Sequence, residues 1–322
     1  MFEVKDYDPL EENDIEGLPY LYQPGHLRYS REYYVNRVFE NKSFSVYSNK
    51  KRLAVCIMTE SFEQDQKFLD AYGAPFLYWL PEAMDVGREQ LDAYCTQLIS
   101  EIIDKHPDSH ISYHNRNAAE IDKISELLLK KGGSILCNWH SVIDLAVDIS
   151  TLKRNLRSSY KSLINKYLPI LNPTCLDDKN CTWDDVLAFR KLHMEEAGRE
   201  TRSIKTWEEQ FHQIQSGEAY IIHSRLNGEL VGASFILKSK EECCYGVGAY
   251  KRSLFPMPIS HVNLWKAIVC AKEISCRYFD VGQIHFPYMK PTVSEKEYNI
   301  GFFKSGFGGK IIPRFYVHFV PT

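Results

Sequence analysis

The sequence lacks several features that assign a function quickly. It has no G-x-G-x-x-G and no G-x-x-x-x-G-K-[ST] loop, so it does not indicate nucleotide binding through those loops. Its nine cysteines form no C-x-x-C pair, and Cys56, Cys137 and the adjacent Cys243 and Cys244 lie in apolar runs, which is typical of reduced core thiols. No apolar run approaches the roughly 18 residues of a membrane span, so we expect no membrane-spanning helix.

An excess of charge of one sign is also lacking. The formal net charge of −3 over 322 residues argues against bulk binding to DNA, although a local basic face can still bind a phosphorylated ligand. His106, His110 and His114 are four residues apart, but Pro107 interrupts the helix that would align them, so we expect no metal site. The acidic N-terminal stretch has no signal-peptide-like apolar segment, and we expect a cytoplasmic protein.

The composition that is present fits a folded protein of one or two domains. Hydrophobic residues make up 44% of the chain, which is ample for a core. Aromatic residues reach 13%, including twenty Tyr. Such a content suits a carbohydrate or nucleotide cleft, but it more often reflects well-filled cores.

The order of elements predicted from apolar periodicity occurs twice. Residues 44–148 and 219–320 each show hairpin, helix, strand, helix and strand, with hairpin turns at Asn49–Lys50 and Asn227–Gly228. We infer two copies of one α/β fold, each a mixed sheet flanked by helices. The expected domains are 1–150, with an extended arm over residues 1–30, and 151–322.

The second half opens with two helices that sequence signals place. Thr182 with Asp185 and Thr206 with Glu209 have the spacing of capping boxes, which predicts a helix start at each threonine. The loop between these helices contains AGRETRS.

The stretch 242–283 reads strand, loop, helix and strand. Gly246 and Gly248 interrupt its first strand, and a glycine inside a strand usually marks a bulge or a close approach by another backbone or a ligand. Ser260 is predicted to cap the following helix. With Lys251 and Arg252 just before it, that helix N-terminus could bind a phosphate or carboxylate. The alternative is a buried crossover helix preceded by ordinary solvated cations.

Residues 151–176 contain five basic side chains and no acid, which predicts an amphipathic helix with a basic stripe. Lys153, Arg157 and Lys161 recur every four residues, and Lys166 follows. The stripe is either a solvated surface or the binding face for an anionic ligand at the domain junction.

The element order over residues 170–320 is similar to the GNAT acyltransferase fold. In that family the fourth strand bulges and separates from the fifth, so that its backbone binds the pantetheine arm of coenzyme A, and the next helix N-terminus holds the pyrophosphate. The resemblance implies acyl-CoA as a cosubstrate, with no tightly bound cofactor. The residues that it assigns to acyl-CoA binding are Tyr245, Gly246, Val247, Gly248, Lys251, Arg252 and Ser260.

A closer resemblance is to the Fem-type branch, which has two GNAT-like domains, a basic junction segment and a C-terminal helix ending in a phrase like FKxGFG. The corresponding stretches are RSSYKSLINK at 157–166, YFDVGQ at 278–283 and FFKSGFGG at 302–309. This implies a bacterial enzyme of surface-polysaccharide or cell-wall biosynthesis. It would transfer an acyl or aminoacyl group from acyl-CoA or aminoacyl-tRNA to an amino group of a sugar, nucleotide-sugar or cell-wall peptide precursor. No heptad segment matches the coiled-coil arm of aminoacyl-tRNA users, so we expect that donor less.

Three residues are candidates for the chemistry. The resemblance implies that Lys304 stabilises the transition state; the alternative is a helix-end lysine that only contacts carbonyls. Asp280 ends the fifth strand, where it could accept the amine proton or bind a sugar hydroxyl, or merely cap a loop. His261 could contact phosphate or act as a base, although a single histidine is more often a hydrogen-bonded structural residue.

Substrate binding is assigned to cations and to one amide. Arg199 and Arg202 lie in the loop that covers the acceptor in GNAT proteins, where either could bind a carboxylate or phosphate, or simply pair with neighbouring glutamates. Arg157, Lys161 and Gln283 complete the set. The competing function is a catalytically silent binding protein, which a cleft filled by aromatic side chains would favour.

Overall fold

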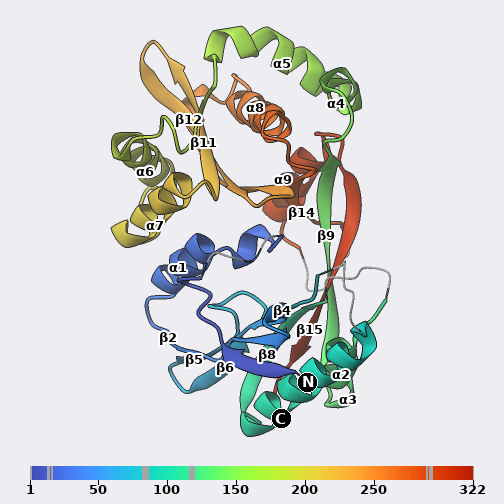
Figure 1. Ribbon diagram of the computed structural model, residues 1–322. Helices are drawn as coiled ribbons and strands as arrows, with labels where there is room; N and C mark the ends of the chain where they lie inside the picture. The colour runs from blue at the N-terminus through green and yellow to red at the C-terminus, as the bar shows by residue number, and fades with distance from the viewer. Residues whose placement is uncertain are drawn as a thin grey trace. The chain divides into compact units, whose positions relative to one another are not determined.

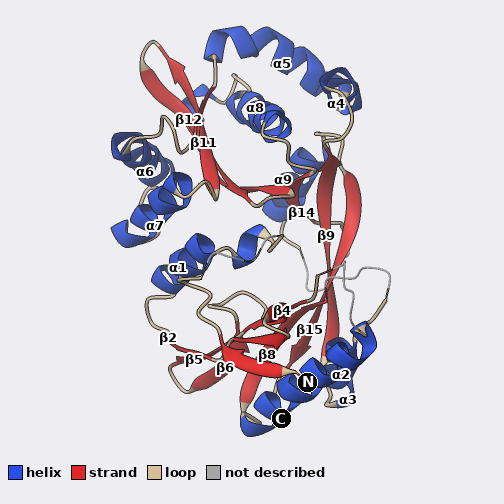
Figure 2. Cartoon of the chain, in the orientation of Figure 1, coloured by secondary structure: helices blue, strands red, loops and turns tan. Residues whose placement is uncertain are grey.

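The computed structural model describes residues 2–12, 15, 17–81, 87–115, 120–287, 289 and 293–321, which form a mixed α/β chain (Figures 1 and 2). By its internal contacts the chain divides into two compact units, which are considered separately below. The first unit comprises Met1–Ile15, Leu21–Asn138 and Pro313–Thr322. The second comprises Glu16–Tyr20 and Trp139–Ile312.

This division differs from the expected boundary after residue 150 because it follows strand pairing. Strand β9 (Ser134–Asp144) begins in the first unit, but Trp139–Asp144 pairs antiparallel with β14 (Tyr278–Ile284) of the second. Strand β15 (Lys310–Phe319) begins in the second unit, but Phe315–Phe319 pairs with β8 (Ser109–Asn115) of the first. Each unit therefore includes a strand that chain order alone assigns to the other.

In the part of the first unit that the structure describes, the strands pair in two runs and three α-helices are present. Asn49 and Lys50 have φ of 50° and 64°, which confirms the predicted two-residue turn between β3 (Phe44–Ser48) and β4 (Lys51–Ile57). The expected extended arm contains a helix, α1 (Pro24–Tyr33), with a proline in its first turn. One strand order is β1 (Glu3–Asp6), β3 (Phe44–Ser48), β4 (Lys51–Ile57) and β7 (Leu77–Trp79). The other is β15, β8, β6 (Gln66–Asp70), β5 (Thr59–Glu63) and β2 (Val38–Asn41). The helices are α1 (Pro24–Tyr33), α2 (Arg88–Lys105) and α3 (Lys123–Lys130).

The second unit confirms the element order predicted for residues 170–320. Its strands lie in the order β10 (Thr174–Leu176), β11 (Ala219–Leu226), β12 (Glu229–Lys238), β13 (Glu242–Tyr250), β14 and β9. Its later helices are α6 (Trp183–Ala197), α7 (Ile204–Gln215), α8 (Ile259–Glu273) and α9 (Glu295–Ser305). Figure 1 shows α6 and α7 on one face of β11 and β12 and α8 on the other. Both strands are buried along nearly their whole length because helices cover both faces.

Two of the three predicted helix starts need correction. Thr182 and Asp185 form the predicted capping box of α6. The second box is absent, because α7 begins after Ser203 and the Thr206 hydroxyl donates to the Ser203 carbonyl oxygen at 2.7 Å. Helix α8 begins at Ile259, so Ser260 lies inside its first turn and does not cap it.

The basic segment forms two helices instead of one. Helix α4 (Ile149–Asn155) ends before α5 (Ser158–Leu171), and Leu156 and Arg157 between them have extended ψ angles of 148° and 140°. The apolar side of the segment is buried as the pattern predicts. Because of this break, Arg157 is not aligned with Lys153 and Lys161 on one continuous helix face.

Candidate functional site

Strands β13 and β14 are parallel neighbours that separate after three residue pairs. Glu242–Cys244 pairs with Tyr278–Asp280, and the pairing stops there. On the other side of β13, Phe235 pairs with Val247 and Ile236 with Tyr245, so Gly246 is the additional residue of a β-bulge. The parallel pair, the bulge and the separation near Gly246 confirm the geometry predicted from the sequence.

Lys304 lies at the point of separation. It belongs to the last turn of α9, and a Cβ atom placed on Gly282 would be 2.5 Å from its Nζ atom, so the ammonium lies over the backbone of β14. Burial lowers the pKa of Lys304, while Cys244 and Asp280, the last paired residues of the two strands, act in the opposite direction. Among the described residues, none forms a hydrogen bond or ion pair with this ammonium. A partly buried positive charge without an ion-pair partner in the described structure is thus held over β14 at Gly282, just after the parallel pairing with β13 ends.

Asp280 is buried, with 1% of its surface exposed, and accepts hydrogen bonds from three sides. Its carboxylate accepts from the Gly282 N–H at 2.7 Å and from the Tyr20 hydroxyl at 3.4 Å, and it lies 2.9 Å from His140 Nδ1. The sequence left two roles open for Asp280: accepting the amine proton or binding a sugar hydroxyl, or capping a loop at the end of the strand. In the structure it bonds to neighbouring groups and fixes the orientation of the His140 ring.

His140 was not identified from the sequence. It is the only histidine in β9 and belongs to no motif. Only the pairing of β9 with β14, which sets His140 opposite Gln283, brings it to Asp280 across 140 residues of chain. No local signal could have revealed it.

Arg157 and Tyr160 hold the end of the helix that carries Lys304. The Arg157 N–H donates to the Gly306 carbonyl at 2.9 Å, and its guanidinium donates to the Phe302 carbonyl at 3.0 Å and lies 3.9 Å from the centre of that ring. The Tyr160 hydroxyl donates to the Phe303 carbonyl at 3.1 Å. A positive charge at a helix C-terminus satisfies its last carbonyls and its dipole. Arg157, expected to bind a substrate anion, is therefore engaged with α9.

The glycines of FFKSGFGG permit this close packing. A Cβ atom on Gly306 would be 2.3 Å from the Tyr160 ring, and one on Gly308 would be 2.6 Å from the Asn155 carbonyl oxygen. Both distances are too short for any larger residue. The two resembling stretches, 157–166 and 302–309, thus fit directly against each other.

His261 packs in an aromatic cluster near the same helix. Its ring centre lies 4.3 Å from Tyr160, 5.0 Å from Phe303 and 6.3 Å from Phe307. Burial, with a smaller contribution from the positive charge of Arg157, lowers the pKa of His261 to about 4. The ring is therefore neutral near pH 7 and a weak base.

The protein's own tyrosines account for the close approach at Gly248. A Cβ atom there would be 2.4 Å from the Tyr245 hydroxyl and 2.6 Å from the Tyr250 hydroxyl, which lie 3.1 Å apart. Tyr250 also bonds with Ser234 at 2.8 Å. Burial raises the pKa of both phenols, so they are neutral. Phenol rings thus occupy the side of β13 where a ligand was suspected.

The two cations expected at a pyrophosphate already have partners. Lys251 forms an ion pair with Glu229, and Arg252 Nε lies 3.7 Å from Glu196. A cavity of about 260 Å³ opens at the start of α8, lined mainly by apolar side chains, with Ser260 and His261 as polar members. The surroundings of this helix N-terminus are therefore less positive than the sequence suggested.

The remaining predicted residues lie elsewhere in the second unit. The Arg202 guanidinium stacks 3.9 Å from the centre of the Trp207 ring and donates to Gln210 at 2.8 Å. Arg199 is exposed in the α6–α7 loop, and Lys161 lies one turn after Arg157 on α5. Of the predicted residues, Lys304, Asp280 and Gln283 therefore lie on or beside β14. His140, which was not predicted, lies beside them.

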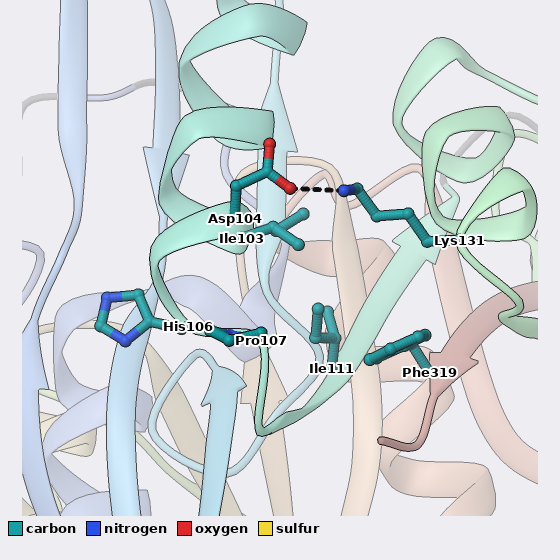
Figure 3. Close-up of a pocket in the computed structure, with 7 residues that line it drawn as sticks. All are labelled: Ile103, Asp104, His106, Pro107, Ile111, Lys131 and Phe319. Carbon is teal, nitrogen blue, oxygen red and sulfur yellow. Dashed lines mark hydrogen bonds and ion pairs between the residues drawn. The ribbon is translucent and has the colours of Figure 1, made fainter. Parts of the chain in front are cut away.

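The first unit has a separate cavity of about 230 Å³, shown in Figure 3. Asp104 and Lys131 form an ion pair at its edge, and His106 pairs with buried Glu60 at 2.8 Å. Because Asp104, Lys131 and His106 already have charged partners, they are poorer candidates for binding or catalysis than Lys304. No three His, Cys, Asp or Glu side chains within the described ranges form a metal-binding group. None of the helices built from those residues is long and apolar enough to cross a membrane.

The strand order and the separation of β13 from β14 place the protein in the class of GNAT folds. No family model and no curated protein matches the sequence, whereas solved structures do match the fold. FemX aligns with a TM-score of 0.61 at 12% identity, over 92% of this chain and 95% of its own. L-PGS from Bacillus licheniformis gives 0.57 at 13%, over 89% and 85%. A domain assigned to a lysylphosphatidylglycerol synthetase of Agrobacterium fabrum gives 0.58 at 11%, over 91% and 85%.

Within that class the particular form is the Fem-like double GNAT fold, with two GNAT-like domains in tandem. This confirms the fold predicted from the sequence. At these identities the likeness concerns the fold.

Proposed function

We propose that the protein is a GNAT-type acyl- or aminoacyltransferase. It transfers the group from an activated donor to an amino group of a sugar, nucleotide-sugar or cell-wall peptide precursor. One observation carries the proposal: the ammonium of Lys304 lies over Gly282, where β13 and β14 separate, without an ion-pair partner in the described structure. The fold shared with FemX supports the same class of reaction.

The position of Lys304 suits the charge that develops during acyl transfer. As the acceptor amine attacks, the donor carbonyl oxygen becomes negative and needs a positive group or N–H already in place. The partly buried ammonium meets that need in a setting where charge interactions are stronger than in water. Burial lowers the pKa of Lys304, and nearby Cys244 and Asp280 offset part of that effect because both favour its charged form.

The surroundings of α8 bear on the donor. Lys251 and Arg252 pair with carboxylates, and Tyr245 and Tyr250 fill the space beside Gly248. These contacts weaken the support for acyl-CoA, which the sequence favoured over aminoacyl-tRNA, because the two cations expected at its pyrophosphate are paired. Lys161 and exposed Arg199 are cations left for a negatively charged acceptor.

Replacement of Lys304 tests the proposal. Wild type and variants are incubated with acetyl-CoA or aminoacyl-tRNA and a panel of amino sugars, nucleotide-linked amino sugars and cell-wall peptides, and products are measured by mass spectrometry. Lys304→Ala should fold and reduce turnover about 100- to 1,000-fold, the typical cost of removing one oxyanion donor. Lys304→Arg should recover only part of it, because a planar fork replaces a compact ammonium. Lys296→Ala, an exposed change on the same helix, is the matched control. Near-normal turnover by folded Lys304→Ala would refute the role.

One observation favours a second candidate, a catalytically silent binding protein. Aromatic rings occupy both the side of β13 at Gly248 and the space around His261. If no donor in the panel supports transfer while mass spectrometry of the purified protein finds a retained small molecule, the binding function is the better assignment.

A further inference from the structure

The pair formed by His140 and Asp280 has the geometry of a base and the group that orients it. Asp280 is 1% exposed and lies 2.9 Å from His140 Nδ1. An ionised carboxylate can only accept a hydrogen bond, so Nδ1 donates to Asp280, and in the neutral form of the ring the lone pair is then on Nε2. The His140 side chain is 14% exposed, and no described residue bonds to Nε2. That nitrogen is therefore open to a ligand.

The same carboxylate connects this histidine to Lys304. The charge of Asp280 favours the protonated form of Lys304. Its Oδ2 atom faces His140, and its Oδ1 atom accepts from the N–H of Gly282, the residue over which the Lys304 ammonium lies. A group for the developing oxyanion and a group for the acceptor proton thus lie around one buried side chain. Acyl transfer to an amine needs both.

The two bases considered from the sequence fit the task less well. The Asp280 oxygens are already bonded to Gly282, Tyr20 and His140. His261 packs among Tyr160, Phe303 and Phe307 and is a weak base. Only His140 combines a fixed ring, an open nitrogen and contact with the Lys304 site.

We propose that His140 is the general base for the acceptor amine and that Asp280 is its positioning residue. The inference rests on the proposed transferase function. Nε2 takes one proton from the acceptor ammonium, and the neutral nitrogen then attacks the donor carbonyl. The N–C bond forms as the bond from carbon to the leaving oxygen or sulfur breaks. The second amine proton goes to the leaving group, and His140 returns its proton to water, so that protons and charge balance.

The test uses two amines that differ in their need for a base. p-Nitrophenyl acetate serves as the acyl donor, with ethanolamine, mostly an ammonium at pH 7, or hydroxylamine, mostly neutral there, as acceptor. His140→Gln should lower kcat with ethanolamine about 100-fold or more and leave hydroxylamine within a few-fold of wild type. Lys304→Ala should lower both. His212→Gln, on the exposed side of α7, is the control.

The outcomes separate this inference from the function on which it rests. If wild type acylates neither amine, both are overturned. If it acylates both and His140→Gln slows them equally or not at all, the transferase stands and the base assignment fails. Histidine ¹⁵N chemical shifts give a measurement without a donor. A neutral ring with its proton on Nδ1 supports the assignment, whereas a proton on Nε2 overturns it.

Discussion

The contact between Arg157 and the end of α9 leads to a prediction that distinguishes two roles for one residue. If Arg157 binds a ligand anion, its removal should leave α9 unchanged in the free protein. If its side chain anchors the helix, as the bonds from the guanidinium to the Phe302 carbonyl and the Ser305 hydroxyl indicate, its removal should loosen the turn that carries Lys304. The perturbation is Arg157→Ala, with Lys161→Ala, one turn later on α5, as the matched loss of charge.

The expected size follows from the contacts that disappear. The guanidinium donates to the Phe302 carbonyl at 3.0 Å and to the Ser305 hydroxyl at 3.3 Å. Hydrogen bonds from a charged group contribute about 1.5–3 kcal/mol when buried and less here, because these are partly solvated. Stacking at 3.9 Å on the exposed Phe302 ring adds about 0.5–1 kcal/mol. The sum is about 2–3 kcal/mol for opening the last turn of α9, which is roughly a 30- to 150-fold change.

Hydrogen exchange of the amides in residues 302–307 measures this opening locally, without requiring the two units to unfold together. Arg157→Ala should speed their exchange by roughly that factor. Lys161→Ala should change it by less than about threefold, since isolated surface changes cost within about 0.5 kcal/mol. Equal exchange rates in wild type and Arg157→Ala would refute the anchoring role.

Two further predictions concern Gly282 and His261. Gly282 has φ of +105°, and a Cβ there would be 2.5 Å from Lys304 Nζ, so Gly282→Ala should displace the ammonium and reduce transfer at least tenfold. Gly228→Ala, at φ +83° in open space, should impose similar backbone strain of about 1–2 kcal/mol without that loss; equal activities would contradict the placement of Lys304. Because the folded pKa of His261 is about 4, below its ordinary 6.5, the unfolded chain binds more protons between these values, so stability should fall as pH falls from 6.5 to 4. His261 should account for about 1–2 kcal/mol of this loss in the free energy of unfolding, after allowance for its partial exposure. His261→Phe should remove that part of the pH dependence. Urea midpoints of both proteins measured from pH 6.5 to 4 test this, and an equal loss of stability in wild type and variant would disprove it.

Local signals in the sequence predicted most of the second unit. The Asn227–Gly228 turn has φ of 51° and 83°, and Thr182 caps α6, because these features depend on residues close in the chain. Gly246 was predicted at the bulge on the same basis, since a strand tolerates a glycine mainly where its pairing is irregular. Such signals do not depend on tertiary packing.

What the sequence did not show depends on contacts between distant segments. His140 reaches Asp280 only because β9 pairs with β14, and the contacts of Arg157 with α9 require the close approach of Gly306 to Tyr160 of α5. Residue type alone did not indicate that Lys251 and Arg252 pair with Glu229 and Glu196. Strands β5 and β6 of the first unit were not predicted. In β6, with the sequence QKFLD, the polar residues at both ends leave too short an apolar run to indicate a strand.

The exchange of β9 and β15 between the units limits how the chain can be divided. A fragment that starts at residue 151 would lack Trp139–Asp144 and would leave the edge of β14 unpaired. That edge includes Asp280, which would also lose His140. An unpaired apolar strand edge is a template for association with other chains, so such a fragment should aggregate. A cut before residue 139 keeps this strand with its partner, and dissection of the protein should therefore begin there.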